Sequence, residues 1–557
     1  MSLIDPIEQP SSPGQSRLAA LLLWRDPDGR RRLAPWGWLA ASLLLLIALL
    51  PPLFLPLGPD EAMFFESGRK ILQGAIHYRD IVDVKPPLIY YTYALAILIF
   101  GPSDFGMHLF DLILQSLTCM MIIALVRHAL RSDLLAVASA LCYAVLYSGQ
   151  RFGCEGQSES YCGLIGCAML WLLIRRRSAW GCIAVGLLAG VLAMLKLTLG
   201  GMLGVAMLGE LMVFRVGWRV TARHCGLMLC GFLPVIILFA AYIIGFGAAD
   251  DFGLMMRFTA GYAAIETSSV SVIVHNFIVW SSGYFLGHYS VAMLLLTIIG
   301  CVMAFSRRRL PARDLPDATA LLRLSALAVM VLFITISIEG RHYVYHYSRL
   351  YAFGAIVSAA AAGEIIIRIR ASQNRSLAFR AGIWVAAIAM LPLGPLPRYL
   401  WRTLPVIHSI SEGKWSMEAF YDRMDRVYPR MEMKGIGKTM RSEKGADDEL
   451  LVVSSLGALV YQIAGEVPRF KIYHSAFLIA DFAPREWRDS TSAYILRRRP
   501  RFIVAQRGDS IRTLTGNDRT SIEALEALPG VDSLLHADYR TRFATPNFVL
   551  FKRLDDR

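Results

Sequence analysis

Residues 36–56 read WGWLAASLLLLIALLPPLFLP, and residues 60–91 read DEAMFFESGRKILQGAIHYRDIVDVKPPLIYY. The first stretch carries no charge and is long enough to cross a bilayer, because a spanning helix needs about 20 apolar residues. The second stretch is charged and aromatic, and it leads into a new apolar run that opens with Pro86 and Pro87. Similar uncharged runs recur along the chain, so the sequence predicts a polytopic α-helical membrane protein.

About eleven transmembrane helices are expected. The chain of 557 residues is 55% hydrophobic and 18% charged, whereas a soluble protein carries about 25% charged residues. The candidate spans are 36–56, 107–126, 133–148, 160–174, 179–195, 198–214, 225–247, 289–305, 322–338, 347–367 and 379–397. We therefore predict a tail over residues 1–35, a transmembrane domain over 36–399 and a soluble domain over 400–557.

The apolar run 86–100 decides the topology. If it does not cross the membrane, the arginines of the short loops all fall on one side, together with those of the N-terminal tail. Positively charged loops face the cytoplasm. We therefore expect a cytoplasmic N-terminus, an interfacial or re-entrant helix over 86–100, a large external loop over 57–106 and an external C-terminal domain. The expected location is a cell membrane, most simply the bacterial inner membrane.

Composition also excludes some functions. The net charge of +14 does not indicate nucleic-acid binding, because the arginines lie mostly in short loops between apolar runs. All nine cysteines lie at or before Cys301, with no spacing typical of a metal site. The C-terminal domain shows strand-like runs at 450–454, 502–505, 538–543 and 548–552 between helical segments, which predicts a small α/β domain.

Asp60 and Glu61 follow the first span directly. A carboxylate at the membrane surface beside a sugar acceptor can serve as a general base. The alternative is structural, because Asp60 could cap the helix that starts near Glu61. Lys85, in the segment Asp83-Val84-Lys85, lies where a lipid phosphate would be, and its alternative is a lysine whose stem lies along the interface.

Three further groups lie at predicted external ends of spans. Glu155 and Glu159 stand four residues apart in a polar loop that could hold an acceptor or simply be solvated. Lys196 interrupts two apolar runs at a turn. A third group could grip an anion through its arginine or form an aromatic belt: Arg341, His342, Tyr345, His346 and Tyr347. Together these loops bring acids and bases to one membrane face.

The segment from Asp60 to Tyr91 resembles the first external loop of the GT-C superfamily. It looks most like the branch of protein O-mannosyltransferases and the lipid A aminoarabinose transferase, described as glycosyltransferase family 39-like. In that branch an acidic residue follows the first span, and a Lys-Pro-Pro segment opens a juxtamembrane helix. The segments GRHYVYHYSRLYAF and LKLTLGG resemble later parts of the same pattern, so the resemblance covers roughly residues 36–400.

The resemblance implies an inverting transfer of a sugar, hexosyl or pentosyl, from a polyprenyl-phosphate donor to a glycan, lipid or protein. Asp60, with Glu61 beside it, would be the base, and Lys85, Arg341 and Lys196 would hold the lipid phosphate, with His346 and Tyr347 nearby. Glu155, Glu159 or Asp83 would supply a second acidic site. Relatives that bind metal carry an acid before the lysine, where this chain has Val84, so no metal site is carried over, although a divalent cation stays possible.

Two other classes of function stay open at this point. A flippase or transporter of lipid-linked sugars would also place charges among its spans, but it should show internal repeats and helices broken near the midplane. A non-catalytic membrane scaffold would have no need of Asp60 or Lys85. The expected partners are the lipid-linked donor, its acceptor and the bilayer, with no nucleic acid.

Overall fold

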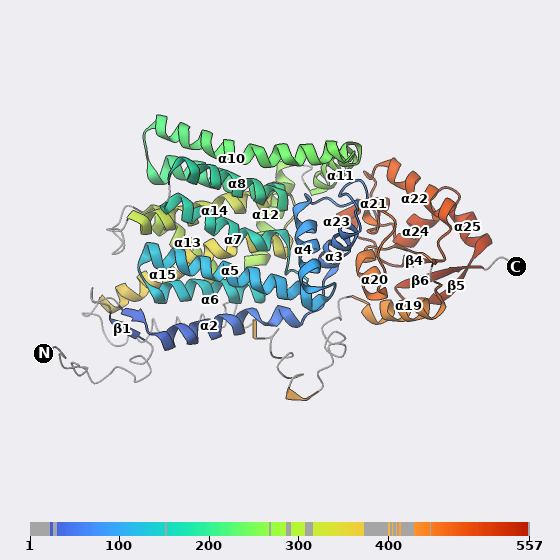
Figure 1. The fold of residues 1–557 in the computed structure, drawn as a ribbon, viewed down its shortest axis with the longest axis horizontal. Coiled ribbons are helices and arrows are strands. Elements are labelled where there is room, and N and C mark those ends of the chain that lie inside the picture. Colours follow the sequence, from blue (N-terminus) through green and yellow to red (C-terminus); the bar gives the residue numbers. More distant parts are fainter. Residues whose placement is uncertain are drawn as a thin grey trace.

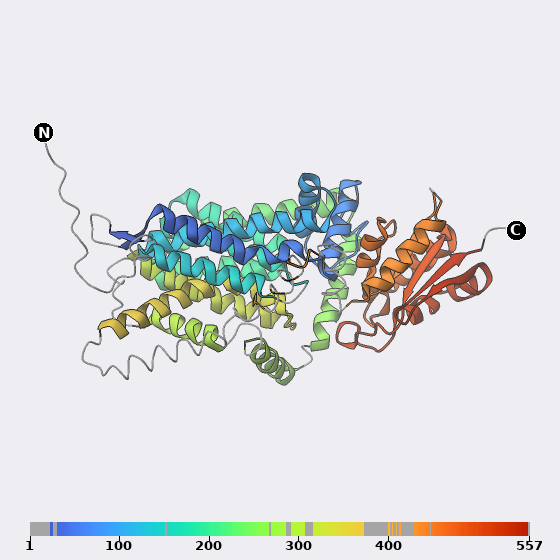
Figure 2. The ribbon, with the colours of Figure 1, turned by 90° about the horizontal axis from the view of Figure 1, so that it is seen from below.

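The structure is a computed structural model that describes residues 23–25, 31–150, 153–175, 177–266, 269–285, 291–306, 316–371, 399–400, 404, 408, 411–413, 428–445 and 447–554. A bundle of long helices forms one end of the molecule, and a smaller domain with a β-sheet forms the other (Figure 1). The view from below shows the same two parts side by side along the long axis (Figure 2). This arrangement confirms the predicted membrane protein with a C-terminal α/β domain.

The bundle helices follow the apolar runs of the sequence. They are α2 (Pro35–Leu49), α5 (Asp104–Leu130), α6 (Asp133–Ser148), α7 (Cys162–Arg175), α8 (Ala179–Leu195), α9 (Gly201–Gly209), α10 (Trp218–Gly245), α13 (Val291–Phe305), α14 (Pro316–Ile338) and α15 (Tyr351–Ala371). Six helical segments within the described residues are long and apolar enough to cross a membrane, and four shorter apolar helices accompany them. The predicted span 379–397 lies outside the described residues.

Several spans depart from the predicted runs in detail. The run 198–214 is divided into η3 (Leu197–Gly200), α9 and a π-helical turn, η4 (Glu210–Phe214), which ends where Arg215 adopts a left-handed conformation. Residues between 247 and 289, where no span was predicted, form α11 (Ala249–Glu266) and α12 (Val270–Tyr284). These two helices mix polar and apolar residues, so hydropathy alone did not reveal them. A short hairpin, β1 (Leu23–Arg25) with β2 (Arg31–Leu33), precedes α2.

The loop after the first span is folded rather than extended. After η1 (Pro51–Phe54) it forms α3 (Pro59–Leu72), a turn, and α4 (Leu88–Phe100), the apolar run that follows Pro86 and Pro87. In Figure 1, α4 lies next to the ends of the bundle helices, and α3 lies between α4 and the C-terminal domain. The loop therefore lies between the bundle and the sheet domain.

The C-terminal domain is a four-stranded mixed sheet with helices around it. The strands β3 (Leu450–Val453), β4 (Phe502–Gln506), β5 (Tyr539–Ala544) and β6 (Phe548–Arg553) lie in the order β3-β4-β6-β5. The β3–β4 pair is parallel, and the pairs that involve β6 are antiparallel. The helices are α19 (Arg430–Glu443), α20 (Gly457–Ala464), α21 (Ala476–Ile479), α22 (Arg485–Arg498), α23 (Arg512–Thr515), α24 (Ser521–Glu526) and α25 (Val531–Asp538). All four predicted strands are confirmed.

The C-terminal domain and the first loop share one hydrophobic core. Side chains of α3 and of the turn after it, such as Met63 and Ile81, are buried in the same cluster as Leu451 of the sheet. Backbone and polar bonds join the same parts: the Val82 amide donates to the Lys471 carbonyl at 3.0 Å, and the Lys70 ammonium donates to the Phe470 carbonyl at 3.0 Å. The domain thus holds the loop in place from its outer side.

Candidate functional site

The start of α3 separates the roles of its two acidic residues. The helix begins at Pro59, and the buried Glu61 carboxylate accepts the Gly58 amide at 2.7 Å, which closes a capping box. Proline suits this first position because it has no amide hydrogen to satisfy. The capping role considered for Asp60 is therefore wrong, since Glu61 performs it. The Asp60 side chain instead lies at the surface of the helix start, 43% exposed.

Lys85 lies against Asp60. Its ammonium is 3.7 Å from the Asp60 carboxylate and donates to the Gln157 side-chain oxygen at 3.1 Å. It lies 4.1 Å from the ring centre of Phe64 and 5.5 Å from that of Tyr345. Aromatic rings attract a cation in this range. Lys85 is only 11% exposed, so it is enclosed by the protein rather than extended along the interface. Asp60 and Lys85 are called the loop pair below.

The backbone at Lys85 is fixed by residues of the same loop. Its carbonyl accepts the Tyr78 hydroxyl at 3.2 Å and contacts the His77 ring at 3.1 Å. Asp83, two residues earlier, is buried, and its carboxylate accepts the Val84 amide at 2.6 Å. Burial raises the pKa of Asp83, and the nearby Lys85 charge opposes that rise. Asp83 therefore shapes the turn that presents Lys85.

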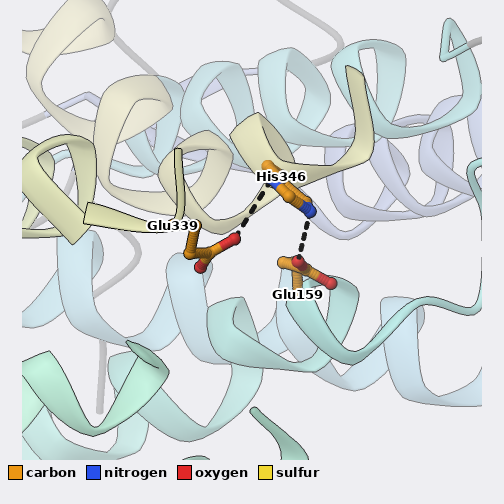
Figure 3. Close-up of side chains that lie close together, drawn as sticks. All are labelled: Glu159, Glu339 and His346. Atoms are coloured by element: carbon orange, nitrogen blue, oxygen red, sulfur yellow. Dashed lines mark ion pairs between the residues drawn. The ribbon is translucent and has the colours of Figure 1, made fainter. Parts of the chain in front are cut away.

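A second group of charges lies deeper and is called the buried network: Glu159, Lys196, Glu339, His346 and Arg349. Figure 3 shows Glu159 and Glu339 on either side of the His346 ring. The Lys196 ammonium lies 2.6 Å from Glu159 and 2.7 Å from Glu339. The Arg349 guanidinium, fully buried, lies 3.1 Å and 2.7 Å from the same two carboxylates. Two cations thus bridge two acids.

The His346 ring is oriented by its neighbours. Its Nε2 lies 3.0 Å from the Lys196 ammonium, and an ammonium can only donate, so Nε2 is the accepting nitrogen. Its Nδ1 then carries the hydrogen and donates toward the Arg341 carbonyl at 2.9 Å, with the Glu339 carboxylate at 3.1 Å. These contacts assign the neutral Nδ1–H tautomer to His346. The ring therefore links the network to the backbone of Arg341.

Charge balance keeps both acids of the network ionised. Burial by itself would raise the pKa of Glu159, but the Lys196 and Arg349 charges outweigh it and hold that pKa at about 2. Burial also raises the pKa of Glu339, but the Lys196 charge lowers it by more, so that this pKa lies well below its usual range. Both carboxylates are therefore committed to their partners near neutral pH.

The network also has the donor types of a metal site. Ligand atoms of Glu159, Glu339 and His346 lie within 4.8 Å of one another. The Lys196 ammonium, however, lies between 2.6 and 3.0 Å from each of these three side chains, at the point that a bound cation would have to take. The donors therefore suit the ammonium that they already hold, and they are better described as an ion-pair network.

Arg341 is buried against Tyr262. It is 5% exposed, donates to the Tyr262 carbonyl at 2.9 Å and stacks 4.0 Å from the centre of the Tyr262 ring. The Tyr262 hydroxyl lies 3.0 Å from that of Tyr343. The structure thus buries Arg341 against the Tyr262 ring rather than leaving it at the surface.

The remaining predicted residues lie apart from the loop pair. Tyr347 is buried, stacks 3.7 Å from Tyr284 and places its hydroxyl near Ser281 and His342. Glu155 is buried rather than solvated, and so is Glu159, so the solvated-loop alternative is wrong. Glu155 does not share a helix turn with Glu159, because the helical turn that holds Glu159, η2, begins at Ser158.

Sequence reasoning missed several members of the site. Glu339 and Arg349 flank the predicted Arg341 group, and Gln157 lies between the two predicted glutamates. The signal was available, because isolated charges at the ends of apolar spans are rare and usually have a partner. His474 of the C-terminal domain also faces the loop, and the charges of Asp83 and Asp60 act on it. Its Nδ1 accepts the Ala476 amide at 3.2 Å, which leaves Nε2–H as the donor.

Residues 84–244 match the family described as dolichyl-phosphate-mannose-protein mannosyltransferase. The structure is similar to ArnT from Cupriavidus metallidurans bound to undecaprenyl phosphate, with TM-score 0.50, 14% identity, and coverage of 94% of this chain and 99% of that one. No curated protein matches the chain in sequence.

An archaeal oligosaccharyltransferase, AglB from Archaeoglobus fulgidus in complex with an inhibitory peptide and a dolichol-phosphate, also matches. Its TM-score is 0.47 at 12% identity, with 85% of this chain and 69% of that one covered. The match of residues 84–244 to the mannosyltransferase family and the similarity to ArnT confirm the resemblance inferred from the first external loop, and the chain has the fold of the GT-C membrane glycosyltransferases.

Proposed function

We propose that the protein transfers a sugar from a polyprenyl-phosphate-linked donor to a hydroxyl group of a glycan, lipid or protein. The observation that carries this proposal is the loop pair, a partly exposed carboxylate 3.7 Å from an enclosed ammonium. A base and a phosphate ligand are what such a transfer requires. Support for the lipid carrier comes from ArnT, which is described with undecaprenyl phosphate bound.

The loop pair is built to exchange partners. A charge-assisted bond is typically about 2.8 Å long, so the 3.7 Å contact between Asp60 and Lys85 is a loose one. A donor phosphate can therefore take the Lys85 ammonium and leave the Asp60 carboxylate free for the acceptor. Gln157, Phe64 and Tyr345 keep Lys85 in position during that exchange.

The chemical step is a single displacement that inverts the anomeric carbon. The acceptor oxygen forms a bond to that carbon while the bond to the phosphate oxygen breaks, and the phosphate leaves with the electron pair. Asp60 takes the proton of the attacking hydroxyl. Lys85 and Arg341 stabilise the charge that develops on the polyprenyl phosphate, which is the second product.

The buried network positions these groups without reacting. It fixes the His346 ring, whose Nδ1–H holds the Arg341 carbonyl at 2.9 Å. The network also holds Glu159 in place, and Glu159 stands two residues after Gln157, the partner of Lys85. Lys196, which was expected to touch the phosphate, acts in this proposal through Glu159 and Glu339.

The proposed orientation puts the site outside the cell membrane. The arginine-rich loops and the N-terminus face the cytoplasm, and the first loop with the C-terminal domain faces outward. The bacterial inner membrane is the proposed location. A reporter fused after residue 554 should read as external, and a cytoplasmic readout would contradict the topology and the placement of the site.

The direct test is binding of undecaprenyl phosphate to the purified full chain in lipid nanodiscs. Lys85→Ala should weaken binding roughly ten- to hundredfold, because a lost bond to a charged group costs about 1.5–3 kcal/mol. Arg79→Ala is the matched control, since Arg79 is a cation of the same loop that pairs with Asp80 at 2.8 Å. Equal affinity of the Lys85→Ala variant and the parent would overturn the proposal.

A further inference from the structure

A cavity of about 390 Å³ lies at the junction of the bundle and the C-terminal domain, away from the loop pair. One wall is the start of α5, and the other walls are α19 and the end of α20. The lining residues are Asp104, Arg430, Lys434, Lys438, Arg441, Gln462 and Ile463. This group is called the α19 pocket.

The α19 pocket is lined mainly by positively charged side chains. Its four cations stand at spacings of four, four and three residues on α19, which places them on one face of the helix over roughly 16 Å. The other face carries Met433, Ile436 and Met440, which are buried in the domain core. Among the described residues of the lining Asp104 is the one acid, and its carboxylate accepts a hydrogen bond from Gln462.

Two of the four cations build the walls. Arg430 donates to the Leu57 carbonyl at 2.9 Å, which ties α19 to the end of the first span. Arg441 donates to the Ala464 carbonyl at 3.0 Å, which ties α19 to α20. Lys434 and Lys438 lie between these two arginines on the same helix face, so they stand at the middle of this wall of the pocket.

The position of the pocket indicates what kind of ligand reaches it. Asp104 is the first residue of α5, a 27-residue helix long and apolar enough to cross the membrane. Close to it in the chain, three large apolar side chains are exposed: Leu98 by 71%, Ile99 by 56% and Phe105 by 45%. Exposed apolar side chains at the end of a span belong in lipid. The base of the pocket therefore lies at headgroup depth.

We propose that the α19 pocket binds the phosphate of an anionic lipid headgroup. Lys434 and Lys438 supply charge to the phosphate, while the acyl chains lie along the exposed side chains of α4 and α5. Lysine near a membrane surface attracts anionic lipid in this way. The inference does not depend on sugar transfer, because the pocket shares no residue with the loop pair or the buried network.

The experiment uses the full chain in neutral detergent, with bound lipids counted by native mass spectrometry. The probes are phosphatidylglycerol, phosphatidylcholine and inorganic phosphate, each titrated over the same range. The parent should retain phosphatidylglycerol in preference to phosphatidylcholine, and equal concentrations of inorganic phosphate should not displace it. The double variant Lys434→Gln, Lys438→Gln should bind phosphatidylglycerol roughly thirtyfold more weakly.

Two controls keep the result decisive. The double variant Arg497→Gln, Arg540→Gln removes the same charge from exposed positions of the C-terminal domain and should bind as the parent does. An unchanged melting temperature shows that the lysine variant is folded. Displacement by inorganic phosphate would assign the pocket to a soluble phosphate, and equal retention of phosphatidylcholine would assign it to apolar contact. Either result, or full retention by the lysine variant, overturns the proposal.

Discussion

The loop pair and the buried network use the same kinds of charges in opposite ways. In the loop pair one carboxylate meets one ammonium at 3.7 Å, and the carboxylate is 43% exposed. In the buried network two carboxylates meet two cations at 2.6 to 3.1 Å, and Glu159 and Arg349 are fully buried. One arrangement leaves its charges available, and the other satisfies them.

This difference indicates which of the two groups of charges serves chemistry and which serves rigidity. A buried ion pair that is fully bonded is costly to break, because removal of one partner leaves an uncompensated charge. A loose, partly solvated pair contributes little to stability and can change partners at little cost. We therefore expect changes in the loop pair to affect transfer, and changes in the buried network to affect folding.

The largest effect is expected for Asp60→Asn. The amide fills the same space but cannot accept the proton, so transfer should fall by about 10²–10⁴-fold. Binding of undecaprenyl phosphate should be kept or tightened, because a competing negative charge next to Lys85 is removed. Transfer and binding are measured on the same purified protein.

Glu61→Ala is the matched control for Asp60→Asn. It removes the carboxylate that caps α3 and should cost about 1–2 kcal/mol of stability, seen as a lower melting temperature. Asp60→Asn should melt as the parent does. Transfer near the parent level in the Asp60→Asn variant would return Asp60 to a structural role and make Glu61 the next candidate base.

For Arg349→Met we expect a loss of free energy of comparable size, but it should appear in the stability of the protein rather than in the rate of transfer. This change leaves Glu159 and Glu339 with one cation instead of two, and breaking a buried pair typically costs about 3–5 kcal/mol. The control is Arg257→Met, because the exposed pair of Arg257 with Glu486 should contribute about 0–1 kcal/mol. Thermal unfolding in one detergent compares the two, and equal melting temperatures would end the distinction between the two regions.

Arg341→Ala should have an intermediate effect and sharpen the boundary between the regions. Arg341 belongs to neither group but is held by both Tyr262 and His346. Loss of its charge should weaken undecaprenyl phosphate binding roughly ten- to hundredfold. Arg341→Lys should recover part of the affinity, because it keeps the charge and loses the planar fork. Unchanged binding in the alanine variant would limit the role of Arg341 to its contacts with Tyr262.

The smallest effect is expected for the pH response of His474. Burial lowers the pKa of His474, although Asp83 and Asp60 oppose it. Above about pH 6.5 the ring is neutral in both the folded and unfolded chain, so His474 does not make the stability depend on pH there. Below that pH only the unfolded chain takes up the proton, so stability should fall as the pH falls. His474→Asn should make the melting temperature fall less between pH 7 and pH 5, and an identical fall in both proteins would contradict this.

The sequence predicted the parts of the fold that depend on long, uniform signals. The largely apolar runs at 107–126 and 133–148 became α5 and α6, and the short strand patterns became β3 to β6. Helices α11 and α12 were missed because they mix polar and apolar residues. Hydropathy detects burial in lipid, and these two helices depend on contacts with the rest of the chain.

The site shows a similar limit. Asp60 and Lys85 were found because Asp60 follows the first span and Lys85 precedes the next apolar run, in a loop with a recognisable pattern. The partners of Lys196 were missed, since Glu159 and Glu339 lie 37 and 143 positions away and only the packed bundle brings them together. A sequence shows which charges are unusual, but the choice of partner depends on tertiary structure.

The core shared by the first loop and the C-terminal domain has a consequence for how the protein is made. Val82 and Lys70 are bonded to Lys471 and Phe470, close to 400 residues later in the chain. At a synthesis rate of about 5–20 residues per second, the ribosome needs on the order of 20–80 s to cover that distance. During that interval part of the apolar surface of the loop stays uncovered. A chain that stops early therefore cannot assemble the loop pair's support, and only complete molecules become competent.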